Sequence, residues 1–127
     1  MLKIVLYILG AIGIIIIGMM AFLVMGLSSG KNLQIGTIDF STLRDGVYHG
    51  AHKAGRWTNE VAVTVAGGRV TNVSVTKDVL VSNPDWKAQT LKSIVDEQTL
   101  QVDIISGATV TMKAYLKAVE NALDQAR

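Results

Sequence analysis

The stretch EVAVTVAGGRVTNVSVT, residues 60–76, decides the fold of this chain. Valine alternates with small or polar residues up to Ala66, and the alternation resumes at Val73 and Val75. Such a period of two places one set of side chains on each face of a β-strand. Gly67-Gly68 stands between the two runs, and glycine readily adopts the positive φ angles of a tight turn. The stretch therefore predicts an antiparallel β-hairpin that turns at the two glycines.

A helix is predicted to follow the hairpin. It should begin at Asn83-Pro84, because asparagine is a good N-cap and proline fits the first helical position. It should end near Glu97 or Gln98. Its apolar residues recur at helical spacing: Ala88, Leu91, Ile94 and Val95. The short apolar run Val102–Ile105 that comes next indicates an additional edge strand.

The last part of the chain carries the clearest helical pattern. Its apolar residues form one continuous stripe: Ala108, Met112, Tyr115, Leu116, Val119, Ala122 and Leu123. Polar residues lie on the opposite side of this helix: Lys113, Lys117, Glu120 and Asp124. Asp45-Gly46 indicates a turn before a further short strand. Together these elements predict an α+β domain, in which two helices pack on a small antiparallel sheet.

The first quarter of the chain predicts a transmembrane helix. No charged residue occurs from Ile4 to Gly30, and thirteen of the residues in Ile4–Met25 are Ile, Leu, Val or Phe. A helix of this length spans about 33 Å, enough to cross a hydrocarbon core of about 30 Å. A cleaved signal peptide is the alternative, but the run exceeds the usual length and lacks a good small-x-small cleavage site. We therefore expect an anchor at 1–30, a linker at 31–44 and the folded domain at 45–127.

Charge and composition argue against several classes of function, namely nucleic-acid binding and metal binding. Residues 31–127 hold eleven of the twelve Lys and Arg and all ten acidic residues, so the domain is nearly neutral. A nucleic-acid-binding protein would show a basic stripe, so no nucleic-acid partner is expected. Without cysteine the chain cannot form an iron–sulfur or thiolate metal site. His49 and His52 lack acidic neighbours and are interpreted as surface residues, so no metal site is predicted. Lys3 and the N-terminal amine lie before the anchor, and Lys31 lies after it. Because positive charge favours the cytoplasmic side, this gives a slight bias towards a cytoplasmic N-terminus and an extracytoplasmic domain.

The segment DIISGATVT, residues 103–111, is the candidate for chemistry. It leads into the N-terminus of the last predicted helix, where unpaired backbone N–H groups and the helix dipole favour an anion. Gly107 and Ala108 leave room for a ligand, and Thr109 offers a hydroxyl in or beside the first turn. An ordinary helix cap made by Ser106 and Thr109 explains the same spacing, so the residues alone leave both interpretations open.

The sequence resembles the FMN-binding domain family, which includes the C subunit of the sodium-translocating NADH:quinone reductase and the G subunit of the Rnf complex. Three features match in order over roughly residues 45–123. They are the segment DGVYHG at 45–50, the segment GGRVTNV at 67–73, and Asp-x-x-Ser-Gly-Ala-Thr at 103–109 followed by x-Thr111 and the amphipathic helix. The last pattern is the most specific, because it is the recognition sequence of the family's flavin transferase.

The resemblance implies a function and a set of site residues. The transferase takes FMN from FAD and leaves it as a phosphoester on the threonine that closes the motif, which is Thr109 here. The other expected cofactor-binding residues are Asp103, Ser106, Gly107, Ala108 and Thr111. The chain would then be a membrane-anchored, extracytoplasmic electron carrier, a redox protein or subunit rather than a stand-alone enzyme. Its partners would be the flavin transferase and a membrane electron donor and acceptor.

Two other functions remain open from the sequence. The chain could be an anchored module that binds FMN or another phosphate ligand noncovalently, or a structural or assembly subunit without flavin. Trp57, Trp86 and Tyr115 are aromatic residues able to stack on a flavin ring. Packing in the core is the favoured interpretation for each of the three.

Overall fold

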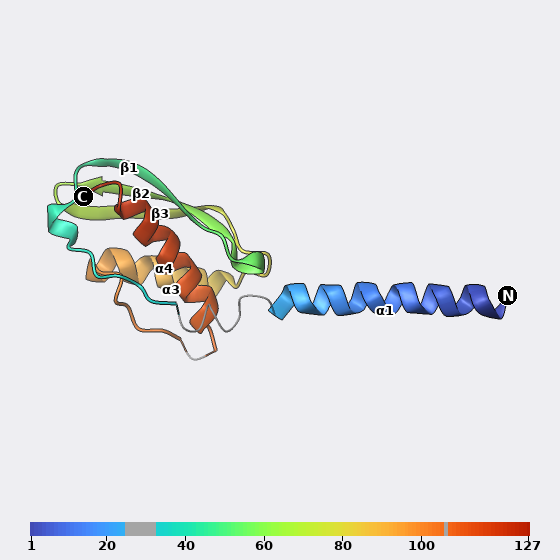
Figure 1. Ribbon diagram of the computed structural model, residues 1–127. Helices are drawn as coiled ribbons and strands as arrows, with labels where there is room; N and C mark the ends of the chain where they lie inside the picture. Colours follow the sequence, from blue (N-terminus) through green and yellow to red (C-terminus); the bar gives the residue numbers. More distant parts are fainter. Residues whose placement is uncertain (25–32, 106) are drawn as a thin grey trace.

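The computed structural model describes residues 1–24, 33–105 and 107–127, and it confirms the α+β fold with an N-terminal helix (Figure 1). The elements are, in order, α1 (Leu2–Val24), η1 (Phe40–Thr42), β1 (Gly46–His52), η2 (Gly55–Trp57), β2 (Asn59–Ala66), β3 (Arg69–Lys77), α3 (Pro84–Glu97) and α4 (Thr109–Leu123). The strands form one antiparallel sheet in the order β1-β2-β3.

The predicted hairpin is confirmed. β2 and β3 pair up to Ala66 and Arg69, and the two residues between them have positive φ angles of 62° at Gly67 and 73° at Gly68. Positive φ at both central residues is the geometry of the type I′ turn, whose twist matches that of the flanking strands. The valines of β2 point into the core and are at most 2% exposed: Val61, Val63 and Val65.

The register of the hairpin departs from simple alternation. Thr64 pairs with Asn72 whereas Val65 pairs with Val70, so β3 has an extra residue, Thr71, at this point. Such a bulge changes the face to which the following side chains point. As a result Val70 and Val73 are both buried although they are three residues apart.

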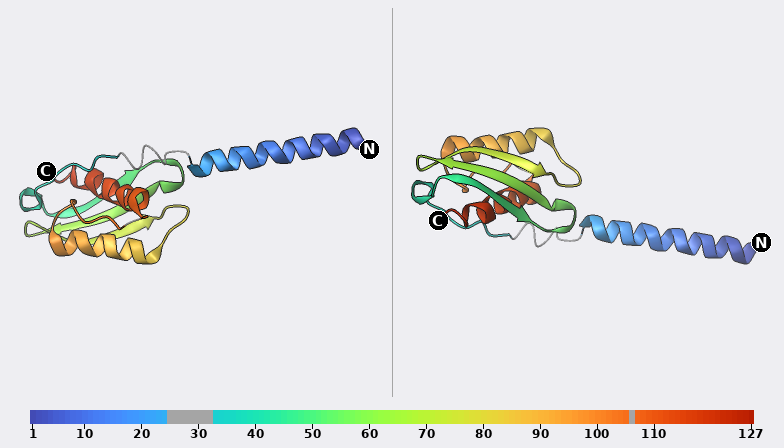
Figure 2. Two further views of the ribbon diagram at one scale, coloured as in Figure 1. Left: turned by 90° about the horizontal axis from the view of Figure 1, so that it is seen from below. Right: turned by 90° about the horizontal axis from the view of Figure 1, so that it is seen from above.

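Helices α3 and α4 cover one face of the sheet, and the views from two further directions show the same two layers (Figures 1 and 2). Helix α4 lies against β1 and β2, and α3 lies against β3. The complete apolar stripe predicted for α4 is buried. Helix α3 begins as predicted, because the Asn83 side chain accepts hydrogen bonds from the amides of Asp85 and Trp86. Of its predicted apolar face, Ala88 is exposed and Ile94 is fully buried.

The C-cap of α3 also protects the sheet edge. Gln98 ends the helix with a φ of 53°, and its side-chain amide donates to the carbonyl of Val70 at 2.8 Å. The same amide accepts from the Val70 N–H at 2.9 Å. Both backbone groups of an edge-strand residue are thus satisfied by one side chain, where an unpaired edge would invite association with another strand.

The edge strand expected at Val102–Ile105 is not present. This segment is irregular, with no strand pairing, although Val102 is buried as its apolar character requires. Other contacts take the place of strand pairing. The neighbouring Gln101 side chain donates to the carbonyls of Ile35 and Gly36, which holds the segment against residues before the sheet.

The packing of residues 33–44 adds two features that the sequence pattern does not indicate. The described part of the expected linker contributes buried side chains to the main core: Ile38, Phe40 and Leu43. Glu120, expected on the polar face of α4, is 8% exposed. The amide of Gly36 donates to its Oε1 at 2.8 Å, and Lys117 pairs with its Oε2 at 2.6 Å. The chain that crosses α4 therefore covers a carboxylate on the polar side of the helix.

Helix α1 extends away from the domain, and none of its residues is buried in the structure (Figure 1). Among the described residues it is the one helix that is long and apolar enough to cross a membrane. By length and composition it fits a membrane anchor or a signal sequence. Its C-terminal end lies beside η2.

Candidate functional site

The N-terminus of α4 places Thr109 at the first helical position. The N-cap is Ala108, whose side chain makes no capping hydrogen bond, and Gly107 before it has a φ of 87°, a conformation that favours glycine. Thr109 is half-buried and Thr111 is 9% exposed. Thr109 is therefore not the N-cap of α4, and Ser106 lies outside the described residues.

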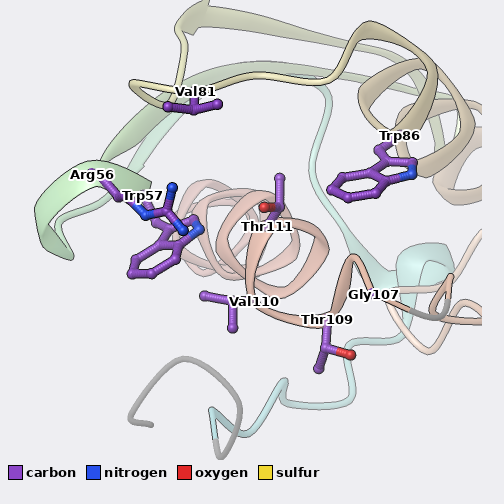
Figure 3. A pocket seen from close by; sticks show the side chains of 8 residues that line it. All are labelled: Arg56, Trp57, Val81, Trp86, Gly107, Thr109, Val110 and Thr111. Carbon is purple, nitrogen blue, oxygen red and sulfur yellow. The ribbon is translucent and has the colours of Figure 1, made fainter. Parts of the chain in front are cut away.

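Beside this helix start lies a cavity of about 470 Å³ (Figure 3). Its volume is in the range of ligand pockets, about 300–1,000 Å³. Four segments meet around it: η2, the loop after β3, the first turn of α3 and the start of α4. The lining residues are Arg56, Trp57, Val81, Trp86, Gly107, Thr109, Val110 and Thr111.

The structure brings some of the expected site residues together and leaves others apart. Gly107, Thr109 and Thr111 line the cavity, and Ala108 is buried at the N-cap between them. Asp103 is exposed in the preceding loop and does not line the cavity.

Two aromatic residues that the sequence assigned to the core also belong to the cavity wall. Trp57 is 4% exposed and packs in a small core cluster, yet it lines the cavity as well. Trp86 is half-buried on α3 and lies across the cavity from it (Figure 3). The third aromatic candidate, Tyr115, is fully buried and is not a lining residue.

Sequence reasoning did not identify Arg56 and Val81 as site residues. The Arg56 guanidinium carbon lies 4.3 Å from the centroid of the Trp57 ring, a cation–π contact. The loop of Val81 is held near η2, because the amide of Leu80 donates to the Arg56 carbonyl at 2.9 Å. The adjacent Arg-Trp pair was a usable signal for Arg56, whereas the approach of the Val81 loop depends on tertiary structure.

A half-buried hydrogen-bond network joins α4, the residue after β3 and α3. The Tyr115 hydroxyl donates to Asp78 Oδ1 at 2.5 Å, and Lys87 pairs with Asp78 Oδ2 at 2.9 Å. Burial, together with the hydrogen bond and charge of Asp78, raises the pKa of Tyr115 well above its ordinary value. Burial alone would raise the pKa of Asp78, but hydrogen bonds from Tyr115, Lys87 and the Val79 amide, with the charge of Lys87, outweigh it and lower that pKa. The phenol thus stays protonated and links α4 to Asp78, the residue after β3.

The site fits a ligand with a phosphate and an aromatic ring. The helix N-terminus favours negative charge, the tryptophans offer flat apolar surface, and the charged residue among those that line the cavity is a cation, Arg56. Among the described residues no group of three or more His, Asp or Glu side chains gathers as a metal site would require.

Comparison with known proteins gives a family and two relatives. Residues 55–124 match the FMN-binding domain family. A segment of 46 residues is 46% identical to a Vibrio harveyi protein named NADH:acrylate oxidoreductase, and it covers 36% of this chain and 4% of that protein. Over 88 residues the chain is 33% identical to an uncharacterized protein of Treponema pallidum (strain Nichols), covering 65% of this chain and 24% of the relative. The chain thus spans a quarter or less of the length of these relatives.

Proposed function

Because this chain belongs to the FMN-binding domain family, we propose that it is an electron carrier that holds FMN through a phosphoester bond to Thr109. The observation that carries the proposal is the position of Thr109, which lies at the first position of α4, lines the cavity and closes the Asp-x-x-Ser-Gly-Ala-Thr motif. Bound FMN would supply the redox chemistry, since a flavin accepts electrons in pairs and passes them on singly.

The residues around Thr109 suit a phosphoester. A phosphodiester keeps one negative charge, and the helix N-terminus stabilises such a charge by about 0.3–1 kcal/mol. Gly107 leaves open space beside its Cα, because a Cβ there would meet no atom within 4 Å. The chain's own contribution is therefore attachment, orientation of the ring between aromatic walls, and a local field.

The location of the cavity supports a membrane setting for the carrier. We propose that α1 is an uncleaved, single-pass anchor and that the domain lies outside the cytoplasm. The cavity includes η2, which is also the element beside the C-terminal end of α1 (Figure 1). The flavin would then lie at the membrane-proximal end of the domain, within reach of a membrane electron donor and acceptor.

A covalent bond requires an enzyme to make it. We propose that a flavin transferase uses FAD and transfers its FMN half to the Thr109 hydroxyl. The Vibrio harveyi relative is named as an oxidoreductase, and a carrier function for the similar segment in this chain agrees with a redox setting. A tether would also keep the flavin from diffusing away outside the cell.

Replacing Thr109 tests the attachment. Thr109→Val keeps the shape of the side chain but removes the nucleophilic hydroxyl, and the buried stripe of α4 is untouched, so the domain should fold. Co-expressed with a flavin transferase, the wild-type protein should gain the mass of FMN less one water and give a fluorescent band on a denaturing gel. The Thr109→Val protein should show neither.

Two variants serve as controls for this experiment. Thr111→Val should retain label, because Thr111 lies beyond the accepting position. Asp103→Ala should reduce the rate of labelling without removing the acceptor. Covalent flavin on Thr109→Val at the wild-type level would contradict the assignment. A wild-type protein that carries FMN lost on denaturation would instead support noncovalent binding, and one that never carries FMN would support a structural role.

A further inference from the structure

We propose that Arg56 holds the ring end of the bound flavin and binds the reduced ring more tightly than the oxidised ring. The inference rests on the proposed function, because it concerns the ring of FMN in the cavity beside Thr109. It adds to attachment a residue that sets the redox potential of the carrier.

The charge of the cavity wall is the first argument. Of the eight described residues that line the cavity, Arg56 is the single charged one. The other seven residues are uncharged: six have apolar or neutral polar side chains, and the seventh is a glycine. A positive charge in a partly apolar cavity acts more strongly than in water, because solvent screens it less. The wall thus favours a ligand that carries, or gains, negative charge next to Arg56.

The second argument is that the guanidinium is held in place without using its hydrogen-bond donors. Its carbon lies 4.3 Å from the centroid of the Trp57 ring, and Trp57 is 4% exposed and packs in the core. Within residues 33–105 and 107–127 the Arg56 side chain has no hydrogen bond or ion pair, and its Nε is buried without a partner. A buried donor without an acceptor is unfavourable, so a ligand whose acceptors reach this guanidinium, after a small shift of the side chain, would be stabilised.

The third argument decides which end of FMN meets Arg56. Figure 3 shows the Thr109 hydroxyl pointing away from Arg56, with the two side chains well apart and Trp86 across the cavity from the Arg56–Trp57 pair. A phosphate bonded to Thr109 is already served by the N-terminus of α4. The part of the ligand that extends across the cavity is the ribityl chain and then the isoalloxazine ring. The ring therefore meets the guanidinium, and the phosphate does not.

Flavin chemistry then gives the preference for the reduced ring. Two electrons and one proton reduce the ring at N5 and leave a negative charge shared between N1 and the C2 carbonyl oxygen. The planar, permanently charged guanidinium of Arg56 can donate to both of these acceptors. The oxidised ring offers the same acceptors without the charge. Binding the reduced form more tightly raises the midpoint potential of the flavin.

The test is a potentiometric titration of the full-length, covalently labelled protein with dithionite. Arg56→Gln should lower the midpoint potential by at least the equivalent of a tenfold loss of preference for the reduced ring, which is about 30 mV for a two-electron couple. Arg56→Lys keeps the positive charge but lacks the paired donors of the planar guanidinium. Its midpoint potential should therefore lie between those of Arg56→Gln and the wild-type protein. Lys53→Gln, an equal charge change at an exposed residue that does not line the cavity, should leave the potential at the wild-type value.

Free ligands separate a ring contact from a phosphate contact. Unlabelled full-length protein, made without the transferase, is titrated with FMN and with riboflavin, and quenching of flavin fluorescence is followed. If Arg56 contacts the ring, Arg56→Gln weakens both ligands by the same factor. If Arg56→Gln weakens the binding of FMN but not of riboflavin, Arg56 contacts the phosphate and the proposal is overturned. The proposal is also overturned if riboflavin binds neither to the wild-type protein nor to the variant.

The outcomes also distinguish this proposal from the attachment. A labelled wild-type protein whose potential is unchanged in Arg56→Gln refutes the role of Arg56 and leaves the bond to Thr109 intact. A wild-type protein that is never labelled refutes the attachment, while the riboflavin titration still decides whether Arg56 contacts the ring. Thermal unfolding of each variant without flavin shows whether the fold is retained.

Discussion

Gly68 has a φ of 73°, a region that β-branched side chains rarely adopt. A Cβ there would lie 3.4 Å from the Ser41 carbonyl oxygen, an ordinary contact, so backbone strain and not crowding would dominate the cost. We expect Gly68→Val to destabilise the domain by roughly 1–3 kcal/mol in denaturant unfolding. Gly68→Asn should cost less, because asparagine tolerates this region. Equal stability of the Val variant and the wild-type protein would contradict the turn geometry.

At the scale of single residues, His52 also makes the stability of the fold depend on pH. Burial, and then the charge of Lys117, lowers its pKa from the ordinary value of 6.5. The unfolded chain therefore binds a proton more readily than the folded one, so the stability that His52 contributes is present above pH 6.5 and is lost as the pH falls towards its folded pKa. Melting temperatures between about pH 7.5 and pH 5 should decline less steeply in His52→Gln than in the wild-type protein. A slope in His52→Gln as steep as that of the wild-type protein would contradict this prediction.

At the scale of elements, the crossing of α4 over β1 depends on Gly50. A Cβ at this position would lie 2.2 Å from the Ala118 carbonyl oxygen and 2.4 Å from the Ala122 amide nitrogen. Helix and strand would have to separate, which typically costs about 1–3 kcal/mol. Gly50→Ala should therefore lower the free energy of unfolding by about 1–3 kcal/mol. The control Val47→Ala, at a side chain that is 59% exposed, should change it by no more than about 0.5 kcal/mol. A Gly50→Ala domain as stable as the control would mean that α4 does not pack so closely.

The first segment of the family resemblance acquires structural roles at this scale. The Tyr48 hydroxyl donates to the carbonyls of Arg44 and Asp45, and Asp45 Oδ1 accepts from the Gly67 amide at 3.0 Å. These contacts join the start of β1 to the β2–β3 turn. Together with Gly50 they show that segment 45–50 builds the sheet and its contact with α4 and does not line the cavity.

For the whole molecule, the proposed anchoring makes a prediction about topology. The chain should sediment with membranes and resist extraction by high salt or carbonate, because α1 is apolar along its length. Protease added to intact spheroplasts should digest the domain, and disruption of the membrane should add nothing to the digestion. Protection of the domain until the membrane is opened would place it in the cytoplasm. Recovery of a mature protein without α1 would mean that α1 is a signal sequence.

The sequence by itself determined the local elements of this protein. Valine alternation, the paired glycines and the Asn83-Pro84 start depend on side-chain periodicity and on backbone preferences of single residues, which are local properties. They predicted the hairpin, both domain helices and the apolar first helix, all of which the structure contains. The motif ending at Thr109 predicted a candidate site at the start of the last helix. Thr109 lines a cavity there, and its role in attachment stays a prediction.

Only the tertiary structure decided which distant residues meet. The bulge at Thr71 places Val70 and Val73 on the same face of the sheet, although strict alternation would place them on opposite faces. The segment that contains Gly36 covers the carboxylate of Glu120. Arg56 lies more than fifty residues before Thr109 in the chain, and no local pattern indicates that the two line one cavity. The physical reason is that burial and proximity depend on how layers pack over long sequence separations. Side-chain periodicity specifies which face of an element is apolar, but not which other segment covers it.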